Sequence, residues 1–194
     1  MAGPNGSGKT TIVDPYIQER FPVWPKLNAD RVALALAEER GAPASPELAR
    51  EAANLVDITA RCLRLHRQPF VLETVLSSDK YRELVPAARR TGLIFRLVYV
   101  TTRHPNFNVE RVRLRVLTGG HDVPEDRIRE RWNRSMDNLP WFAARADRLL
   151  VLDNTGDSPI VIALRHLGGV LELHADGHPA SDRVRPLIGT PAIT

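Results

Sequence analysis

The chain is poor in cysteine and in long hydrophobic runs. Cys62 is the one cysteine among 194 residues, which excludes a disulfide framework and fits a reducing, cytoplasmic compartment. The apolar helical pattern around Cys62 predicts a buried, unreactive thiol. No apolar run approaches the length of a transmembrane helix, and the first residues show no signal-peptide pattern, so we expect no membrane partner.

Lysine is also scarce, occurring only at Lys9, Lys26 and Lys80, so arginine supplies most of the positive charge. The formal net charge of +4 suggests anionic partners, and the guanidinium fork suits phosphate groups. Aromatic residues make up only 6% of the chain, and most tryptophans and tyrosines lie outside the basic segments. Few rings are therefore placed to stack on bases, so nucleic acid is the less suitable partner, with an ATP-dependent nucleic-acid-binding module kept as an alternative.

A complete phosphate-binding loop of the form G-x-x-x-x-G-K-[ST] stands at the start of the sequence. Its backbone N–H groups can cradle the phosphates of ATP or GTP, and a helix that begins near Lys9 adds its positive end. Lys9 is expected to reach the β- and γ-phosphates, while the Thr10 hydroxyl ligates Mg²⁺. The predicted nucleotide-binding residues are Gly3, Pro4, Asn5, Gly6, Ser7, Gly8, Lys9, Thr10 and Thr11.

Only Met1 and Ala2 precede this loop, although such a loop normally follows a buried strand. In a P-loop fold that strand lies in the middle of the sheet. Its loss would leave the neighbouring strands with unpaired backbone groups and an open core. We therefore expect either an upstream start codon or a shortened, weakened kinase.

Apolar strands and amphipathic helices alternate along the chain, which predicts an α/β class. The expected architecture is a three-layer P-loop NTPase/kinase fold with a mainly parallel sheet, its first strand apparently missing, and a helical lid. The kinase domain is assigned to residues 1–174 and the lid to roughly 105–138. Residues 175–194 are rich in Pro, Gly, Asp and Ser and are expected to form a flexible tail that adds little to the core.

Polar residues follow the predicted strands at the point where each strand ends. They are Asn28 and Asp30, then Glu73 and Thr74, then Thr101. Ligands of parallel sheets collect at the carboxyl ends of the strands, so these side chains are expected to face the phosphate loop across one cleft. A phosphate acceptor would have to bind at that position.

Two carboxylates in this set are candidates for chemistry. Asp30 can take the proton of an alcohol acceptor as a general base, although its place before an apolar helix also fits a helix N-cap. Glu73 can bind the acceptor or support Mg²⁺, and the alternative is a solvent-exposed structural role.

Arginine rows mark two helices that a glycine pair connects. Arg111 and Arg115 share one helix face, and Arg127, Arg131 and Arg134 share a face of the next helix. This arrangement is typical of a kinase lid, in which guanidinium groups close onto the transferring phosphoryl group. The alternative is a solvated surface, with the arginines paired to neighbouring glutamates.

Three further patterns carry less weight. The strand at 149–153 imitates a Walker B strand, but the turn at 154–156 suits a strand end near the nucleotide base or a structural cap. His174 and His178 have metal-like spacing without a rigid scaffold, which makes a poor metal site. His121 is kept as a lid residue without an assigned role.

Several segments together resemble the zeta toxin-like P-loop kinases. They are AGPNGSGKTT, LNADRVA, LETVLSS, RVLTGGHDVPEDRIRERWNRSMDNL and DRLLVLDNTGD, which extend from residue 2 to about 157. The resemblance implies a kinase that moves the γ-phosphate of ATP or GTP to the 3′-hydroxyl of UDP-N-acetylglucosamine, and a small helical antitoxin as a possible separate partner. Another small alcohol is the alternative acceptor.

The resemblance also implies roles for individual residues. Lys9 and Thr10 would bind phosphate and Mg²⁺, and Asp30 would be the base. Glu73 and Thr101 would hold the sugar nucleotide, with Asn28 and Thr74 beside them. The residues that would neutralise the transition state are Arg115, Arg131 and, with a weaker match, Arg134, which is otherwise grouped with the substrate-binding residues.

Overall fold

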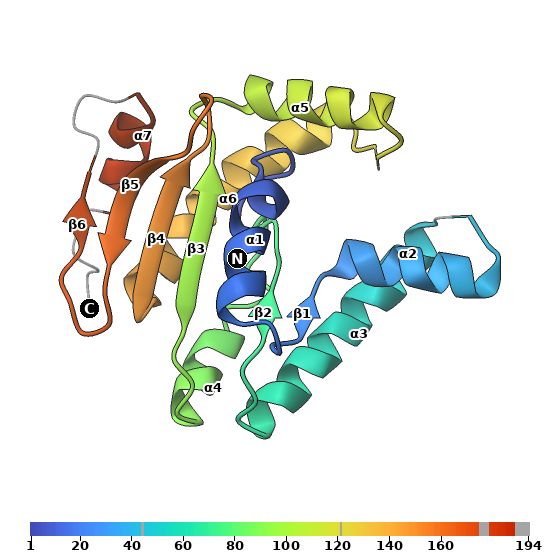
Figure 1. The fold of residues 1–194 in the computed structure, drawn as a ribbon, viewed down its shortest axis with the longest axis horizontal. Helices are drawn as coiled ribbons and strands as arrows, with labels where there is room; N and C mark the ends of the chain where they lie inside the picture. Colours follow the sequence, from blue (N-terminus) through green and yellow to red (C-terminus); the bar gives the residue numbers. More distant parts are fainter. Residues whose placement is uncertain (44, 121, 175–178, 189–194) are drawn as a thin grey trace.

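The computed structural model describes residues 1–43, 45–120, 122–174 and 179–188. A mainly parallel sheet forms its middle layer, and helices pack on both faces (Figure 1). The elements in chain order are α1 (Lys9–Arg20), β1 (Lys26–Leu27), α2 (Ala29–Arg40), α3 (Pro46–Leu65), β2 (Val71–Leu72), α4 (Leu84–Arg90), β3 (Arg96–Thr101), α5 (Pro105–Leu117), α6 (Glu125–Arg145), β4 (Arg148–Asp153), β5 (Ile160–Arg165), β6 (Glu172–Leu173) and α7 (Pro179–Ile188).

The strands form two hydrogen-bonded groups. β1 pairs with β2 in parallel, and β3 pairs with β4 in parallel, while β5 and β6 continue the larger group antiparallel. Ala2 connects the groups, because it makes parallel bridges to Thr74 on one side and Tyr99 on the other. The order is therefore β1, β2, the Met1–Ala2 segment, β3, β4, β5 and β6. The predicted α/β P-loop architecture is confirmed.

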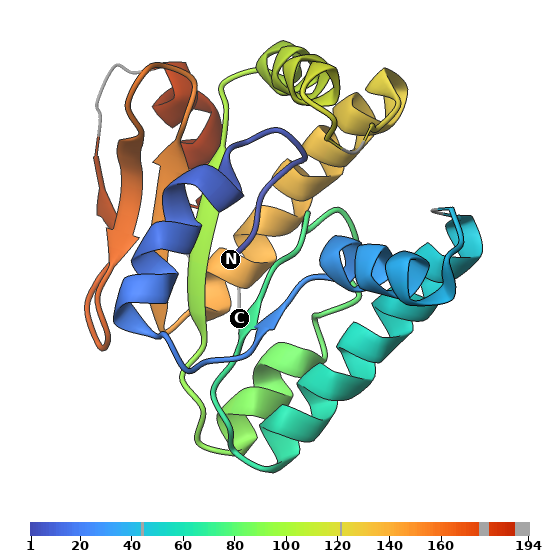
Figure 2. The ribbon, with the colours of Figure 1, turned by 45° about the vertical axis from the view of Figure 1, so that its right-hand side comes forward.

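The core lies on both faces of the β3–β4 strands. Figures 1 and 2 show α1 in front of the sheet and α6 behind it. Val13 of α1 packs on Val100 and Leu152, whereas Trp132 and Phe142 of α6 belong to the larger cluster on the opposite face. This three-layer packing fixes the start of α1, and with it the phosphate loop, at the carboxyl ends of the parallel strands.

The α5–α6 segment, where the lid is predicted, packs partly into the core. The second half of α6 is core, because Met136, Leu139 and Phe142 are all buried under the sheet. The first half of α6 and α5 share a small cluster of their own, formed by Val109, Val112, Val123 and Ile128 with Val116 against it. His121 lies outside the described residues.

The C-terminal segment differs from the expected tail. Residues 179–188 form α7, and its Val184 and Ile188 are buried in the main core cluster. The prediction that residues 175–194 add little to the core is therefore wrong for this helix. These two apolar residues are four positions apart and share one face of α7, which packs against α6 and β5.

The buried face of α3 also differs from the expectation. Leu48, Ala52, Val56 and Ala60 are its buried residues, a narrow row at steps of four, and α3 as a whole packs on α2. Cys62 is exposed, so the prediction of a buried thiol is wrong. Small side chains let the two helices approach, and the larger apolar residues of α3 turn outward.

None of the helices in the described part of the chain is both long enough and apolar enough to cross a membrane.

Candidate functional site

Three glycines give the phosphate loop its shape. Gly3, Gly6 and Gly8 all have positive φ angles, of 143°, 75° and 89°. A side chain at any of them would also collide with a neighbour: the Val100 carbonyl, the Asn108 backbone and the Asn154 side chain respectively. Only glycine combines this conformation with such close approach, so the loop can wrap tightly around an anion.

Two asparagines outside the motif hold the loop in place. The buried Asn108 of α5 donates its amide to the Asn5 carbonyl at 2.6 Å, and the Thr102 hydroxyl donates to its oxygen. Asn154, after β4, donates to the Ser7 carbonyl at 2.9 Å. Sequence reasoning missed both, since nothing local distinguishes them from ordinary polar residues.

Lys9 lies folded against the loop. Its ammonium donates to the carbonyls of Gly3 at 2.7 Å and Pro4 at 3.1 Å. Burial lowers the pKa of Lys9 to about 8; the carboxylates of Glu73 and Asp30 oppose this lowering, and Arg115 adds to it. Three residues that the sequence singled out therefore act electrostatically on the Lys9 ammonium.

Asn28 links the two carboxylate positions. Its side-chain oxygen accepts from the Arg31 amide at 3.1 Å and caps α2, so Asn28 and not Asp30 is the N-cap. Its amide donates to Glu73 Oε2 at 2.7 Å. Asp30 stands in the first turn of α2 with an exposed side chain, free of the capping role and open to an acceptor.

Lys26 and Asp14 belong to the same cluster, and sequence reasoning missed them. Lys26 of β1 forms an ion pair with Asp14 of α1, and its ammonium lies 3.7 Å from Glu73 Oε2. The other Asp14 oxygen, Oδ1, is buried with no hydrogen-bond partner in the described structure. Glu73 is thus held between an amide and an ammonium rather than exposed to solvent.

The arginines divide into two kinds. Arg131 of α6 donates to Asn5 Oδ1 at 3.4 Å, so it reaches the phosphate loop. Arg115 is exposed and acts on Lys9 from α5. Arg134 instead forms an exposed i, i+4 ion pair with Glu130 at 2.7 Å, which is the surface alternative considered for these helices. Of these three arginines, Arg115 and Arg131 are placed toward the loop.

Two predicted substrate-binding threonines have structural roles. Thr101 is fully buried and its hydroxyl donates to the Thr102 carbonyl, while its contact with a sugar nucleotide stays a prediction. The strand alternation turns its side chain toward the α6 layer. Thr74 Oγ1 accepts from the Leu76 amide, and its backbone carbonyl accepts from Gly3. Thr74 therefore shapes the strand end beside the loop.

Asp153 at the end of β4 serves as a structural cap. It is buried, and the Thr155 hydroxyl donates to its Oδ1 at 2.6 Å. The same hydroxyl accepts from the Arg103 amide at 2.8 Å. This turn joins the start of α5 to the loop region, so the Walker B likeness of the strand does not extend to the role of Asp153.

The loop region fits a bound nucleotide. No side chain of the loop caps α1, so the first N–H groups of this helix remain for an anion. Ser7 Oγ is buried without a hydrogen-bond partner in the described structure. Thr10 and Thr11 are exposed in the first turn, where the Thr10 hydroxyl could ligate a nucleotide-bound Mg²⁺. Among the described residues, no group of three or more His, Cys, Asp or Glu could hold a metal alone.

The family profile of an AAA domain, AAA_33, matches residues 1–155, from the phosphate loop to the turn after β4. The chain belongs to this AAA domain family. An uncharacterized protein of Haemophilus influenzae is 25% identical over 130 residues, which cover 67% of this AAA domain chain and 88% of the relative.

Solved structures share the fold. Complexes of AvrRxo1-ORF1 with AvrRxo1-ORF2, one with ATP and one with sulphate ions, match all of this AAA domain chain with TM-scores of 0.69 and 0.71 at 14% and 15% identity. The PezAT chromosomal toxin-antitoxin system of Streptococcus pneumoniae matches 79% of it, with a TM-score of 0.58 and 17% identity. The chain spans just under two thirds of these solved chains, 64% to 65%.

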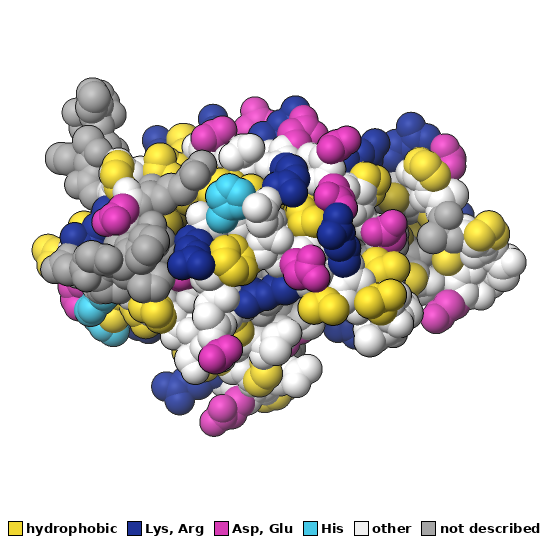
Figure 3. Space-filling view, turned by 90° about the horizontal axis from the view of Figure 1, so that it is seen from above, with side chains coloured by type: hydrophobic (Ala, Val, Ile, Leu, Met, Phe, Trp, Pro, Cys, Tyr) yellow, Lys and Arg dark blue, Asp and Glu magenta, His cyan; other side chains and the backbone are white. Residues whose placement is uncertain are grey.

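The surface above the sheet does not present one continuous basic stripe. Figure 3 looks onto this face, where arginine and lysine side chains are interspersed with aspartate and glutamate. Arg113 pairs with Glu125, and Arg134 with Glu130. A protein that binds nucleic acid must place unneutralised positive charge along the phosphate backbone, so this face of the AAA domain gives no support to a nucleic-acid interface.

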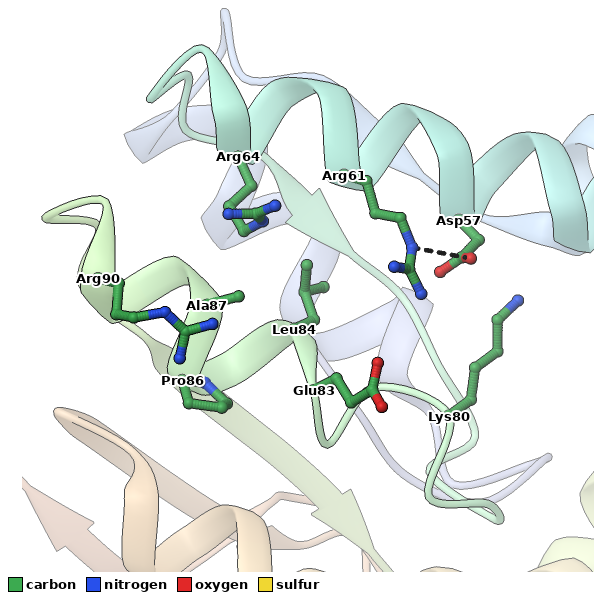
Figure 4. Close-up of a pocket in the computed structure, with 9 residues that line it drawn as sticks. All are labelled: Asp57, Arg61, Arg64, Lys80, Glu83, Leu84, Pro86, Ala87 and Arg90. Atoms are coloured by element: carbon green, nitrogen blue, oxygen red, sulfur yellow. Dashed lines mark hydrogen bonds and ion pairs between the residues drawn. The ribbon is translucent and has the colours of Figure 1, made fainter.

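A hollow of about 370 Å³ lies between α3 and α4, away from the phosphate loop (Figure 4). Charges of both signs line it. Arg61 donates to Asp57 at 3.2 Å, and Glu83 lies between Lys80 and the arginines. Its walls are solvated helix faces, so no ligand is assigned to it.

Replacement of Asn108 by leucine is expected to weaken the loop anchor of this AAA domain. The change leaves the buried Asn5 carbonyl without its donor, which should lower the free energy of unfolding by about 1–3 kcal/mol. Urea unfolding measures this, and nucleotide affinity should fall with it. Asn106→Leu, at an exposed position two residues away in the same helix, is the matched control. Equal stability of the two variants would contradict the anchoring role.

Nucleotide affinity is expected to depend on pH above 8. Free Lys9, with a pKa of about 8, loses its proton there, whereas bound phosphate stabilises the ammonium. Binding therefore takes up a proton, and the dissociation constant should rise toward about tenfold per pH unit between pH 8 and 10. Calorimetric titration at constant ionic strength measures this. Lys9→Arg keeps its charge and should give a flatter profile; a flat profile in the wild type would contradict the assignment.

Proposed function

We propose that this chain is an ATP- or GTP-dependent kinase for a small alcohol, with the 3′-hydroxyl of UDP-N-acetylglucosamine as the first candidate acceptor. The observation that carries this proposal is the convergence on Lys9. Asp30 and Glu73 from two strand ends, and Arg115 from α5, all act on the ammonium that serves the phosphates. Two carboxylates beside this ammonium are suited to bind an alcohol acceptor and to take its proton.

The proposed reaction follows from these positions. Asp30 accepts the proton of the acceptor hydroxyl while its oxygen attacks the γ-phosphorus. The bond between that phosphorus and the β–γ bridging oxygen breaks, and the nucleoside diphosphate leaves with the electron pair. Lys9, Arg115 and Arg131 balance the charge that develops on the phosphoryl oxygens. Mg²⁺ bound to the nucleotide would neutralise further phosphate charge, with Thr10 as its protein ligand.

Glu73 is the proposed acceptor-binding group. Its Oε2 accepts from Asn28, and Lys26 lies beside it, so its position is fixed before a substrate arrives. A carboxylate held in this way can accept hydrogen bonds from sugar hydroxyls. The choice of a sugar nucleotide rests on the resemblance of the LNADRVA, LETVLSS and GGHDVPE segments to the zeta toxin-like kinases.

A separate protein partner is part of the proposal. The structural neighbours come from a two-component complex, AvrRxo1-ORF1 with AvrRxo1-ORF2, and from a toxin-antitoxin system, PezAT. By analogy with them, a small helical antitoxin could bind this chain. Cytoplasmic location remains an expectation that rests on the single cysteine and the sequence pattern.

Nucleoside diphosphate release tests the function directly. With ATP or GTP present, UDP-N-acetylglucosamine should stimulate release, and the product should carry one additional phosphate by mass spectrometry. Lys9→Met, purified in parallel, controls for contaminating kinases. If only another alcohol stimulates release, that alcohol and not UDP-N-acetylglucosamine is the acceptor. The absence of any acceptor-dependent turnover across sugar nucleotides, nucleosides and aminoglycosides would overturn the kinase proposal.

A further inference from the structure

One face of α6 contacts both the phosphate loop and the segment that follows Glu73. In the first half of the helix, Arg131 donates to Asn5 Oδ1 of the loop at 3.4 Å. One turn further along, the hydroxyl of the buried Ser135 donates to the Val75 carbonyl at 2.7 Å. Because α6 runs behind the sheet as a continuous helix (Figures 1 and 2), one rigid element reaches both sides of the candidate site.

The segment after Glu73 contains a backbone conformation that is unusual for its residue type. Leu76 has a φ angle of 62°, in the left-handed region that leucine rarely adopts. Its side chain is buried in the main core cluster, and its amide donates to Thr74 Oγ1 at 3.1 Å. Residues 74–76 therefore form a tight turn directly after Glu73. Such a conformation persists only where neighbouring groups hold it in place.

Two side chains of α6 hold this turn by its carbonyl groups. Ser135 donates to the Val75 carbonyl, and Asn138 donates to the next carbonyl, that of Leu76, at 3.1 Å. The Asn138 side chain is itself oriented, because Arg82 donates to its Oδ1 at 2.8 Å. Two successive carbonyls of the strained turn are thus tied to a single helix.

Tyr99 of β3 supports the Ser135 hydroxyl from within the sheet. The Tyr99 hydroxyl and Ser135 Oγ lie 2.8 Å apart, and both residues are fully buried. Ser135 has one hydroxyl proton and gives it to Val75, so Tyr99 is the donor in this pair. Burial raises the pKa of the Tyr99 phenol well above its usual range, so the phenol remains protonated and able to donate. A buried chain of two hydrogen bonds therefore runs from the sheet through α6 to the turn.

We propose that Ser135 and Asn138 are positioning residues that hold the 74–76 turn and thereby fix the Glu73 carboxylate at the acceptor side of the phosphate loop. The inference rests on the proposed function, in which Glu73 binds the acceptor. Glu73 directly precedes the turn, so a change of backbone conformation there would move its carboxylate away from Asn28, whose amide donates to Oε2 at 2.7 Å. Because α6 also reaches the phosphate loop, it sets the distance between the two sides of the site.

Ser135→Ala and Asn138→Ala, singly and together, test this role in the full chain, with Asn133→Ala at an exposed position of α6 as the matched control. In the double variant, amide exchange at Leu76 should become at least about tenfold faster, while exchange in β3 and β4 stays within about threefold. The side-chain amide resonances of Asn28 should also shift, because they report its bond to the carboxylate. Both measurements are independent of turnover.

Kinetics separate positioning from stability. In the double variant, the Michaelis constant for UDP-N-acetylglucosamine should rise by about 10–100-fold, while nucleotide affinity stays within about threefold. A purely structural role would lower the melting temperature and the active fraction, but it would leave the Michaelis constant unchanged. Tyr99→Phe keeps the bond from Ser135 to Val75 and removes only its support, so it should give a smaller change in the same direction.

Three results would overturn the inference. Unchanged exchange at Leu76 would show that α6 does not hold the turn. Faster exchange with unchanged Asn28 resonances would show that the turn does not fix Glu73, and an unchanged Michaelis constant despite both spectroscopic changes would exclude an effect on the acceptor. Absence of acceptor-dependent turnover in the wild type concerns the proposed function alone, since the first two results need no turnover. If the double variant does not fold, the two single variants provide the same comparison.

Discussion

Asp30→Asn is expected to lower the turnover number for phosphoryl transfer by about 10²–10⁴-fold, the usual contribution of a general base. Asparagine keeps the size of the side chain but cannot take the acceptor proton. The helix itself should be unaffected, because Asn28 provides the cap of α2. Nucleotide affinity should stay within about threefold, since Asp30 acts on Lys9 less strongly than burial and Glu73 do. Single-turnover kinetics with saturating acceptor separates these effects.

Glu38→Gln, on an exposed position of the same helix, is the matched control for Asp30. It removes one negative charge from α2 without entering the cluster around Lys9. Full turnover in the control with a loss in the Asp30 variant localises the effect to the base. Turnover retained in Asp30→Asn would exclude Asp30 from this role and leave Glu73, which accepts from Asn28 and lies 3.7 Å from the Lys26 ammonium, as the candidate.

The sequence predicted the parts of the site that local chemistry encodes. Gly3, Gly6 and Gly8 belong to the phosphate-loop motif and have positive φ angles. The ends of parallel strands bring Asp30 and Glu73 to the same edge of the sheet. The alternation of strands and helices was predicted on the same basis. The fold class and the phosphate loop can therefore be predicted from the spacing of apolar residues, the positions of helix and strand ends, and one sequence motif.

The remainder depends on packing that a sequence does not display. Asn108 lies 103 residues from its partner Asn5, and Lys26 reaches Asp14 only because β1 passes beside α1. Thr101 lies at the predicted strand end, and the alternation of side chains along the strand turns it into the buried interior. The exposure of Cys62 on α3 likewise depends on which face of the helix packs against its neighbours.

Lys9→Met is expected to weaken nucleotide binding by about ten- to two-hundredfold, the value of one charged hydrogen-bond donor to phosphate. Turnover should fall further, by at least about a thousandfold, because the same ammonium stabilises charge that develops only in the transition state. Fluorescence titration with a labelled nucleotide measures the first effect, and acceptor-dependent nucleoside diphosphate release measures the second. Lys80→Met, at an exposed lysine that donates to the Ala53 carbonyl, is the matched control.

Stability should change little in Lys9→Met, and that result separates function from folding. At neutral pH the buried ammonium costs free energy, as its pKa of about 8 indicates, while its bonds to the Gly3 and Pro4 carbonyls return part of that cost. Lys9→Met removes both the cost of the buried charge and the two hydrogen bonds, so the melting temperature should stay within about 3 °C of the wild type or rise. A large fall would mean that Lys9 serves mainly to hold the loop carbonyls together. An unchanged or higher melting temperature, with binding lost, identifies Lys9 as a group kept in an unfavourable environment for the phosphate it meets.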